Sequence, residues 1–252
     1  KPFDEVLIKS MQETTKYLCE NIQGCVLGYT QSDEITLILV DYKKLTSSAW
    51  FDYEVQKICS ITASMATMAF NKLFEKYVDE YRFSKLDGIS NYEDNAWEYI
   101  QVLLSAVEKG AMFDARCFNI TKEEVTNLLY WRQDDAAKNS IQMVGRAFFS
   151  HKELHKKSRN DIQDMLMTQK GINWNDFPTY QKRGSCCVKE NHFIENEKGT
   201  QICFPEGCSD PFEDEEALTG VYRSSWIIDT EIPIFKGEGR EYIDRLVFVG
   251  EE

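Results

Sequence analysis

The stretch CVLGYTQSDEITLILV, residues 25–40, limits the possible folds of this chain more than any other segment. Two largely apolar runs, 25–30 and 34–40, are separated by only three polar residues. A connection this short joins antiparallel neighbours, because parallel strands need a crossover of a dozen or more residues. The segment is therefore predicted to form a β-hairpin with two acids, Asp33 and Glu34, at or next to its tip.

Several helices are predicted outside the hairpin. Apolar residues recur at helical spacing from Asp4 to Ile22, and residues 50–78 contain neither Gly nor Pro. Residues 82–95 are polar and are expected to form a loop, whereas MFDARCFNI at 112–120 alternates like a strand. Further helices are expected at 96–110, 121–149 and 160–171.

This order of elements favours an α+β fold in which helices cover one face of an antiparallel sheet. Thr121 and Glu124 have the spacing of a capping box at the start of a helix. After Gly184 the composition shifts to cysteines, glycines, acids and short strand-like pieces. We therefore expect a main domain at 1–184 and a C-terminal extension at 185–252 that packs on it.

The charge balance restricts the possible partners. With 29 basic and 42 acidic residues, the chain has a net charge of −13, which argues against unspecific attraction to nucleic acid or to an anionic membrane. A nucleic-acid partner would need a local basic site, for which HKELHKKSR and YQKRG are the candidates; the alternative is a solvated face. The RNA-binding candidates are Lys152, Lys156, Lys157, Arg159, Lys182 and Arg183.

No apolar run approaches the roughly 20 residues of a membrane span. The first ten residues resemble neither a secretory signal nor a transit peptide, so we expect a cytoplasmic protein, with a mitochondrial location left open. Most cysteines lie in or beside apolar segments, which favours reduced thiols. The C-terminal cysteines and histidine have no C-x-x-C pair, so burial is favoured over zinc. That group is Cys186, Cys187, His192, Cys203 and Cys208.

The two hairpin acids are candidates for binding a divalent cation. In a regular strand Asp33 and Glu34 would point to opposite faces, but a turn loosens that constraint. Mg²⁺ prefers oxygen ligands and is usually held by one or two carboxylates together with water and substrate phosphates. One aspartate at the hairpin tip supplies half of such a site, and the alternative is an ordinary solvated turn.

GYTQSDE, residues 28–34, resembles the second metal-binding motif of the tRNA-His guanylyltransferase superfamily, polymerases that extend tRNA in the 3′-to-5′ direction. Other segments resemble family motifs in the same order, and together they span residues 1 to about 185. They are KPFDE (1–5), FDARCF (113–118), YWRQDDAAKNS (130–140), GINWND (171–176) and KRG (182–184).

The resemblance implies a core similar to the palm of ordinary polymerases, assembly as a homotetramer, and two Mg²⁺ ions held by two aspartates. Asp33 corresponds to one of them, and Glu34 is the adjacent acid of the metal site. The other aspartate belongs to an Asp-Gly motif ahead of the lysine-proline step, so the resemblance places it before Lys1.

The resemblance also implies that six residues contact nucleotides. Each has a simpler alternative: a helix lysine is commonly a solvated charge, and Arg116 could only neutralise Asp114. The six are Lys1, Asp4 and Ser32 near the triphosphate of the incoming nucleotide, Lys57 and Arg116 near the activating nucleotide, and Asn139, which matches the first asparagine of the family's HINN block.

Ala137 stands where enzymes specific for histidine tRNA carry the histidine of that block. This departure favours the guanylyltransferase-like branch, which uses a template to repair truncated tRNA 5′ ends. The implied reaction adenylylates the tRNA 5′-monophosphate with ATP, after which the 3′-hydroxyl of GTP or another NTP attacks that phosphate and releases AMP. The alternatives are a histidine-tRNA guanylyltransferase, a non-catalytic tRNA-binding protein of the same fold, and a nucleotidyl cyclase.

Overall fold

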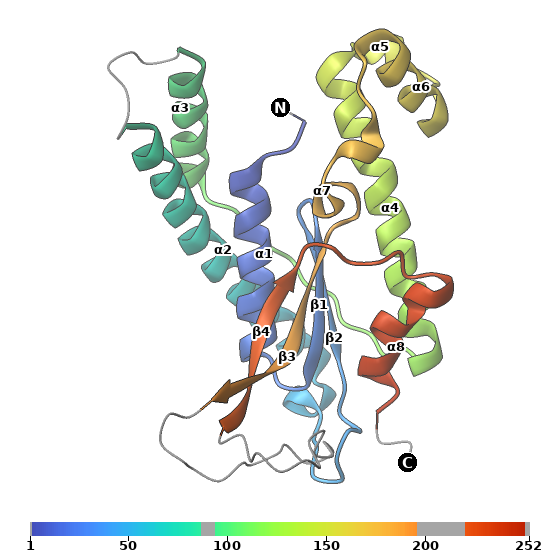
Figure 1. Cartoon of the computed structure of the whole chain (residues 1–252). Coiled ribbons are helices and arrows are strands. Elements are labelled where there is room, and N and C mark those ends of the chain that lie inside the picture. The colour runs from blue at the N-terminus through green and yellow to red at the C-terminus, as the bar shows by residue number, and fades with distance from the viewer. Residues whose placement is uncertain (1, 87–93, 196–219, 250–252) are drawn as a thin grey trace.

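The computed structural model describes residues 2–86, 94–195 and 220–249. A four-stranded antiparallel sheet in the order β2-β1-β3-β4 forms its centre, with helices packed on both sides (Figure 1). The α+β class is therefore confirmed. The strands are β1 (Cys25–Gln31), β2 (Glu34–Leu39), β3 (Ser185–Glu195) and β4 (Gly220–Asp229).

The helices of the described residues agree broadly with the predicted segments. Short 3₁₀ turns occur at Trp50–Tyr53, Trp174–Asp176 and Gly237–Arg240. The α-helices are α1 (Glu5–Asn21), α2 (Val55–Leu86), α3 (Asp94–Lys109), α4 (Lys122–Phe148), α5 (His151–Leu154), α6 (Arg159–Lys170), α7 (Thr179–Arg183) and α8 (Glu241–Val247).

The predicted hairpin is confirmed. Gln31 pairs with Glu34, so the connection consists of two residues, Ser32 and Asp33, and is one residue shorter than expected. Ser32 has a φ of 51°, in the left-handed region that tight hairpin turns require. This turn fixes the direction in which the acid at position 33 leaves the sheet.

β3 lies between β1 and β4, and its register with β1 pairs Leu27 with Val188. The expected boundary at 184 falls between α7 and β3. Residues on both sides of that position therefore contribute to one sheet in the described part of the chain.

Helices cover both faces of the sheet, where we expected only one. On one face, a Cβ at Gly28 would lie 2.5 Å from Cys19 Sγ, so α1 packs directly on the β1 backbone. On the other face, Leu27 and Tyr29 pack with Leu129 of α4. Because β1 presents apolar side chains on one side and close helix contact on the other, neither face is left to solvent.

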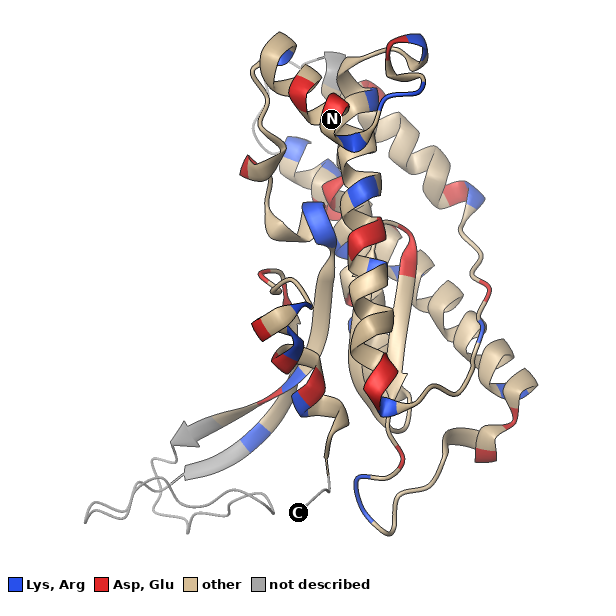
Figure 2. Ribbon diagram, turned by 90° about the vertical axis from the view of Figure 1, so that its right-hand side faces the viewer, with Lys and Arg blue, Asp and Glu red and all other residues tan. Residues whose placement is uncertain are grey.

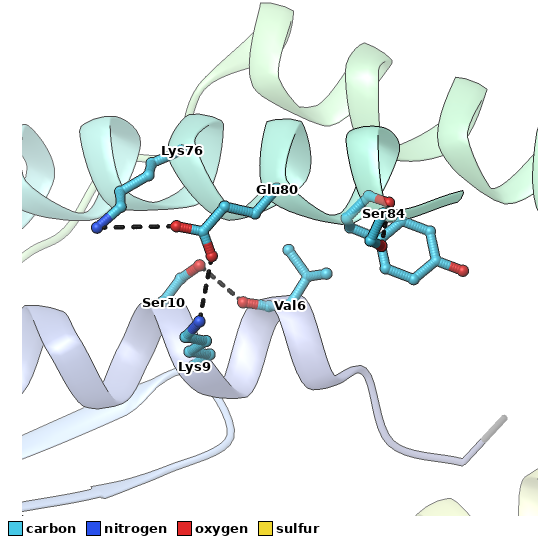
Figure 3. A network of polar contacts seen from close by, with 7 residues as sticks. Val6, Lys9, Ser10, Lys76, Glu80 and Ser84 are labelled. Carbon is cyan, nitrogen blue, oxygen red and sulfur yellow. Dashed lines mark hydrogen bonds and ion pairs between the residues drawn. The ribbon is translucent and has the colours of Figure 1, made fainter. Parts of the chain in front are cut away.

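A polar contact and an apolar cluster join α1 to α2. Lys9 Nζ lies 3.2 Å from Glu80 Oε2, and Lys76 Nζ lies 3.8 Å from the other oxygen of the same carboxylate (Figure 3). Ser10 is buried and donates its hydroxyl to the carbonyl of Val6 at 2.7 Å. The Lys9–Glu80 pair joins the two helices, and the Ser10 hydrogen bond lies within α1. Apolar packing of Val6 against Phe70 and Phe74 holds the first half of α1, which lies at the hairpin-tip end of the sheet.

A separate apolar cluster joins α4 to α6. Ile162 and Leu166 of α6 are buried against Ile141, Val144 and Phe149. Full burial of each such side chain contributes about 1.5–3 kcal/mol, so this small core is enough to fix the corner that α4, α5 and α6 form.

The predicted strand at 112–120 is wrong. The segment is extended and its side chains alternate in exposure up to Phe118, but it pairs with no strand in the described residues. Side chains of α2 satisfy part of its backbone instead: Phe113 N donates to Thr67 Oγ1 at 3.0 Å, and Ala111 N donates to Asn71 Oδ1 at 2.8 Å. Alternation predicted the pattern of side-chain exposure but could not supply a partner strand.

Some predicted helix ends are also corrected. α2 begins at Val55 because Phe51 and Asp52 adopt positive φ angles, and it continues to Leu86, past the start of the predicted loop. The Thr121 side chain makes no capping hydrogen bond. Two complete capping boxes occur instead, at the starts of α5 and α6.

The six cysteines of the described residues are free thiols. Two members of the group considered for zinc, Cys203 and Cys208, lie outside the described residues. Within those residues, no three His, Cys, Asp or Glu side chains are grouped to hold a metal ion. None of the helices described is both long and apolar enough to cross a membrane.

Candidate active site

The hairpin tip, the start of α1, the short helix α7 and the middle of α4 gather at one end of the sheet (Figure 1). Tyr29 of β1 donates its hydroxyl to the carbonyl of Arg183 at 2.7 Å, which joins α7 to the hairpin. Gln181 Nε2 donates to Glu5 Oε1 at 2.5 Å, which joins α7 to α1. Contacts between distant parts of the chain therefore build this end of the molecule.

Asp33 is exposed at the hairpin turn and makes no hydrogen bond or ion pair with any described residue. Its carboxylate oxygens are therefore available to an external ligand. Ser32 is also exposed, and its left-handed backbone creates the turn. Two of the predicted site residues thus share the tip.

Glu34 differs from its neighbour because its carboxylate is already engaged. Arg132 Nη1 of α4 and Gln31 Nε2 each donate to Glu34 Oε2 at 3.1 Å. Both members of the ion pair are about half exposed, at 45% for Arg132 and 51% for Glu34, so the pair contributes only about 0–1 kcal/mol to stability. Its structural effect is to connect the hairpin to α4.

Arg132, Asp135 and Asn139 lie at positions i, i+3 and i+7 of α4, on one helix face. Asn139 Nδ2 donates to Asp135 Oδ2 at 3.2 Å. Burial raises the pKa of the nearby Tyr29 hydroxyl, the charges of Glu34 and Asp135 raise it further, and Arg132 lowers it. Sequence reasoning selected only Asn139 as a site residue, although the helical spacing of the other two was a usable signal.

Asp4 caps α1. Its Oδ1 accepts a hydrogen bond from Leu7 N at 2.9 Å, and its Oδ2 accepts one from Tyr99 OH of α3 at 2.8 Å. Burial is the main cause that raises the pKa of Tyr99, and this hydrogen bond raises it further. Both oxygens are thus used to fix the start of α1, whose amino end favours negative ligands. Lys1 lies outside the described residues.

Lys57 and Arg116 lie together, but away from Asp33. Cys59 Sγ and Cys117 Sγ are 3.7 Å apart, which places the two segments side by side at the start of α2. That point is at the opposite end of the sheet from the hairpin turn (Figure 1), and β2 alone is about 20 Å long. Arg116 pairs only weakly with Asp114, at 3.4 Å between highly exposed groups.

The six basic candidates for RNA binding fall into two groups. Lys152, Lys156 and Lys157 are exposed, whereas Arg159 pairs with Asp134 at 3.3 Å. Lys138, and then Arg159, lower the pKa of that Asp134 carboxyl. Acidic and basic positions are interspersed over the ribbon (Figure 2).

The lysine and arginine of α7 are turned toward the protein. Lys182 Nζ donates to the carbonyl of Asn175 at 2.6 Å and lies 5.7 Å from the centroid of the Trp174 ring. Burial lowers the pKa of Lys182. Arg183 Nε is buried and has no hydrogen-bond partner in the described residues. The Lys182 ammonium group is therefore engaged within the local fold. The part that these two residues take in RNA binding stays a prediction.

Comparison with known proteins places the chain in a family. Over 99% of its length it matches a bacterial tRNA(His) guanylyltransferase (Thg1)-like protein solved in complex with ATP, with 36% sequence identity, a TM-score of 0.71 and 82% of that chain covered. The chain belongs to the Thg1 family. The superfamily resemblance read from the motifs is therefore confirmed.

Further relatives agree with this assignment. The Thg1-like protein in complex with GTP is 34% identical, with a TM-score of 0.67, and the match covers 99% of this chain and 81% of that one. The tRNA(His) guanylyltransferase of Saccharomyces cerevisiae is 22% identical over 77% of this chain and 76% of its own length. The family model described as tRNAHis guanylyltransferase matches residues 1–121. Thg1-family proteins are nucleotidyltransferases, so this chain is an enzyme of that class.

Proposed function

We propose that this Thg1-family protein adds nucleotides to the 5′ end of truncated tRNA in the 3′-to-5′ direction, guided by the opposite strand. The observation that carries the proposal is the Asp33 carboxylate, exposed and without a partner in the described residues, beside the Arg132–Glu34 pair. Relatives solved in complex with ATP and with GTP support a nucleotide site in this chain.

The donor atoms at the hairpin tip fit Mg²⁺. Asp33 offers carboxylate oxygens, which hard cations prefer, and it leaves room for water and phosphate oxygens as the remaining ligands. Glu34 is held by Arg132, so we assign Asp33 as the ligand and Glu34 as the residue that fixes the tip against α4. When bound, two Mg²⁺ ions would neutralise the triphosphate and acidify the attacking hydroxyl.

The resemblance assigns the second metal-binding aspartate to an Asp-Gly motif ahead of Lys1. β2 is the outer strand of the sheet in the described residues, and Phe113 of the extended segment packs in the same cluster as Ile35 of β2. An unpaired strand edge is a ready template for another strand. We therefore place the strand that carries this aspartate along the outer edge of β2.

The residues of this chain act mainly by positioning the reactants, as expected for phosphoryl transfer. The start of α1, with Ser32 beside it, receives the triphosphate of the incoming nucleotide, whose 3′-hydroxyl attacks the adenylylated 5′ phosphate and displaces AMP. Lys57 and Arg116 contact the activating ATP. Because they lie at the other end of the sheet, we infer that they serve a neighbouring subunit of a homotetramer.

Base pairing selects the added nucleotide in this proposal. The α4 position that carries a histidine in enzymes specific for histidine tRNA is Ala137, whose methyl group can neither donate nor accept a hydrogen bond. The protein therefore supplies no imidazole for reading a particular tRNA there. The opposite strand of the acceptor stem is left to specify the base.

The test incubates the full-length protein with ATP, all four NTPs, Mg²⁺ and a 5′-monophosphorylated tRNA that lacks its first nucleotide. We expect addition of the nucleotide complementary to the opposite base, and a change of that base should change the nucleotide added. Addition of G regardless of the opposite base would support a histidine-tRNA enzyme instead. No 5′ extension by a protein that retains both aspartates would contradict the proposal.

A further inference from the structure

A pocket lies where the end of α4 meets α5 and α6. It has a volume of about 530 Å³, within the range of roughly 300–1,000 Å³ for small-molecule sites. Arg146 on α4 is 14 residues, or about 21 Å of helix, beyond Arg132. The pocket is therefore distinct from the hairpin-tip site.

The polar side of this pocket is basic. It is lined by Arg146, His151, His155, Lys156 and Lys157, and no Asp or Glu of the described residues lines it. Lys156 has a φ of 58°, unusual for a lysine, and this turn in the backbone places two consecutive lysines at the pocket. Because the net charge of the chain is −13, this group of basic residues is a local exception to the overall charge.

The acids at this corner are used for another purpose. Glu153 accepts hydrogen bonds from both the backbone and the hydroxyl of Ser150, and Asp161 does the same with Ser158. These hydrogen bonds lower the pKa of both carboxyls, so both remain charged while they cap α5 and α6. Their charges are directed to the helix starts, and the pocket retains its basic character.

The floor of the pocket is apolar. Phe149 and Ile162 are 7% and 3% exposed and belong to the α4–α6 core, and Leu154 packs against the same core. A Cβ at Gly145 would lie 2.8 Å from Ile162 Cγ2, so the absence of a side chain there permits the close helix approach that forms the corner. The floor is therefore part of a rigid core.

A basic wall above an apolar floor has the chemistry of a site for a nucleoside phosphate. The nitrogen donors suit phosphate oxygens, and the apolar floor suits a base or a ribose. We propose that this pocket binds one nucleoside phosphate outside the catalytic site. If this nucleoside phosphate is part of a tRNA, the inference rests on the proposed function. The pocket would then hold the RNA about 20 Å from Asp33 along α4.

Photocrosslinking of the full-length protein distinguishes the two sources of this ligand. tRNA that contains 4-thiouridine and, separately, 8-azido-ATP are irradiated with the protein, and labelled peptides are mapped by mass spectrometry. Labelling of the 146–157 peptides by tRNA identifies an RNA strand as the occupant, and labelling by azido-ATP identifies a free nucleotide. If neither probe labels these peptides, the inference is wrong.

Substitutions test the pocket by a second route. Arg146→Gln and Lys157→Gln should each weaken binding of the crosslinking ligand about tenfold, as expected for one charge-assisted contact. Lys43→Gln removes the same charge from an exposed position in the loop after β2 and should change binding less than twofold. Equal effects of all three variants would show a general charge effect and would overturn the assignment. Arg146→Lys, which retains the charge, provides a folding control.

The catalytic proposal can fail independently of this one. Crosslinking to the pocket should be the same in the wild-type protein and in Asp33→Asn, because the two sites share no residue. A protein that crosslinks at 146–157 but does not extend tRNA would exclude the polymerase activity and retain the pocket. A protein that extends tRNA but does not crosslink at 146–157 would exclude the pocket and retain the polymerase activity.

Discussion

The hairpin tip and the α4–α6 corner lie about 20 Å apart along α4 and use charge in opposite ways. At the tip, the acid Asp33 has no partner among the described residues, whereas the base Arg132 is engaged with Glu34. At the corner, the acids Glu153 and Asp161 are engaged as helix caps, and the basic side chains line a pocket. The ligand of each region is therefore indicated by the charges that the fold leaves unpaired, and the net charge of the chain is a poor guide.

The largest expected effect concerns the unpaired acid at the tip. Asp33→Asn should lower the rate of 5′ extension by about 10³-fold or more, because loss of a metal ligand removes several kcal/mol of transition-state stabilisation. Single-turnover extension assays measure this rate. Asp164→Asn changes another exposed acid, on α6, and serves as the matched control. Similar losses in both variants would contradict a specific role for Asp33.

A substitution in the apolar core beneath the α4–α6 corner should affect that corner more than the hairpin tip. Leu166 is fully buried beneath the corner, so Leu166→Ala should lower the free energy of unfolding by about 2–5 kcal/mol. The damage should be concentrated at the corner, with a greater loss of binding of the ligand that crosslinks to the pocket than of the extension rate per bound tRNA. Denaturant unfolding and separate binding and single-turnover assays test this. A fall in the extension rate with unchanged binding of that ligand would show that the comparison is wrong.

The engaged base at the tip gives a smaller effect. Arg132→Gln removes the ion pair that orients Glu34 and should lower kcat about 10- to 100-fold with little change in KM for NTPs. Stability should change by no more than about 1 kcal/mol, because both partners are half exposed. Lys138→Gln, which breaks an ion pair with Asp134 one turn further along α4, is the control. A stability loss without a kinetic effect would assign the pair a purely structural role.

The smallest effect concerns the engaged acids of the corner. The folded-state pKa of Glu153 is lowered, so its capping contribution is fully present above its ordinary value near 4.5 and is lost as the pH falls through the lowered pKa. The difference in Tm between the wild type and Glu153→Gln should therefore be greatest near neutral pH and shrink below about pH 4.5. A difference that is independent of pH would mean that the charge of Glu153 has no role at the cap.

The sequence predicted those features that local patterns determine. The hairpin followed from two apolar runs with a short polar connection, and the position of Asp33 at its tip followed from that hairpin. Most helices were recognised from their periodicity. Capping at Thr121 was predicted wrongly, because a capping pattern states which hydrogen bonds can form and not which ones do.

Features that depend on distant residues could not be predicted. Leu27 pairs with Val188 across the centre of the sheet, and nothing local in either segment specifies the other. The Arg132–Glu34 contact joins residues 98 positions apart, so its role at the site emerged only from the fold. For the same reason, the sequence did not show that Arg116 lies at the end of the sheet opposite the hairpin turn.

The most direct test of the account is to locate a divalent cation in crystals of the full-length protein. Crystals grown with Mn²⁺ and a non-hydrolysable nucleoside triphosphate would reveal the ion by its anomalous scattering. The account predicts an ion about 2.2 Å from an Asp33 carboxylate oxygen, bridging to the triphosphate. An ion and triphosphate bound together elsewhere, with Asp33 directed to solvent, would contradict it.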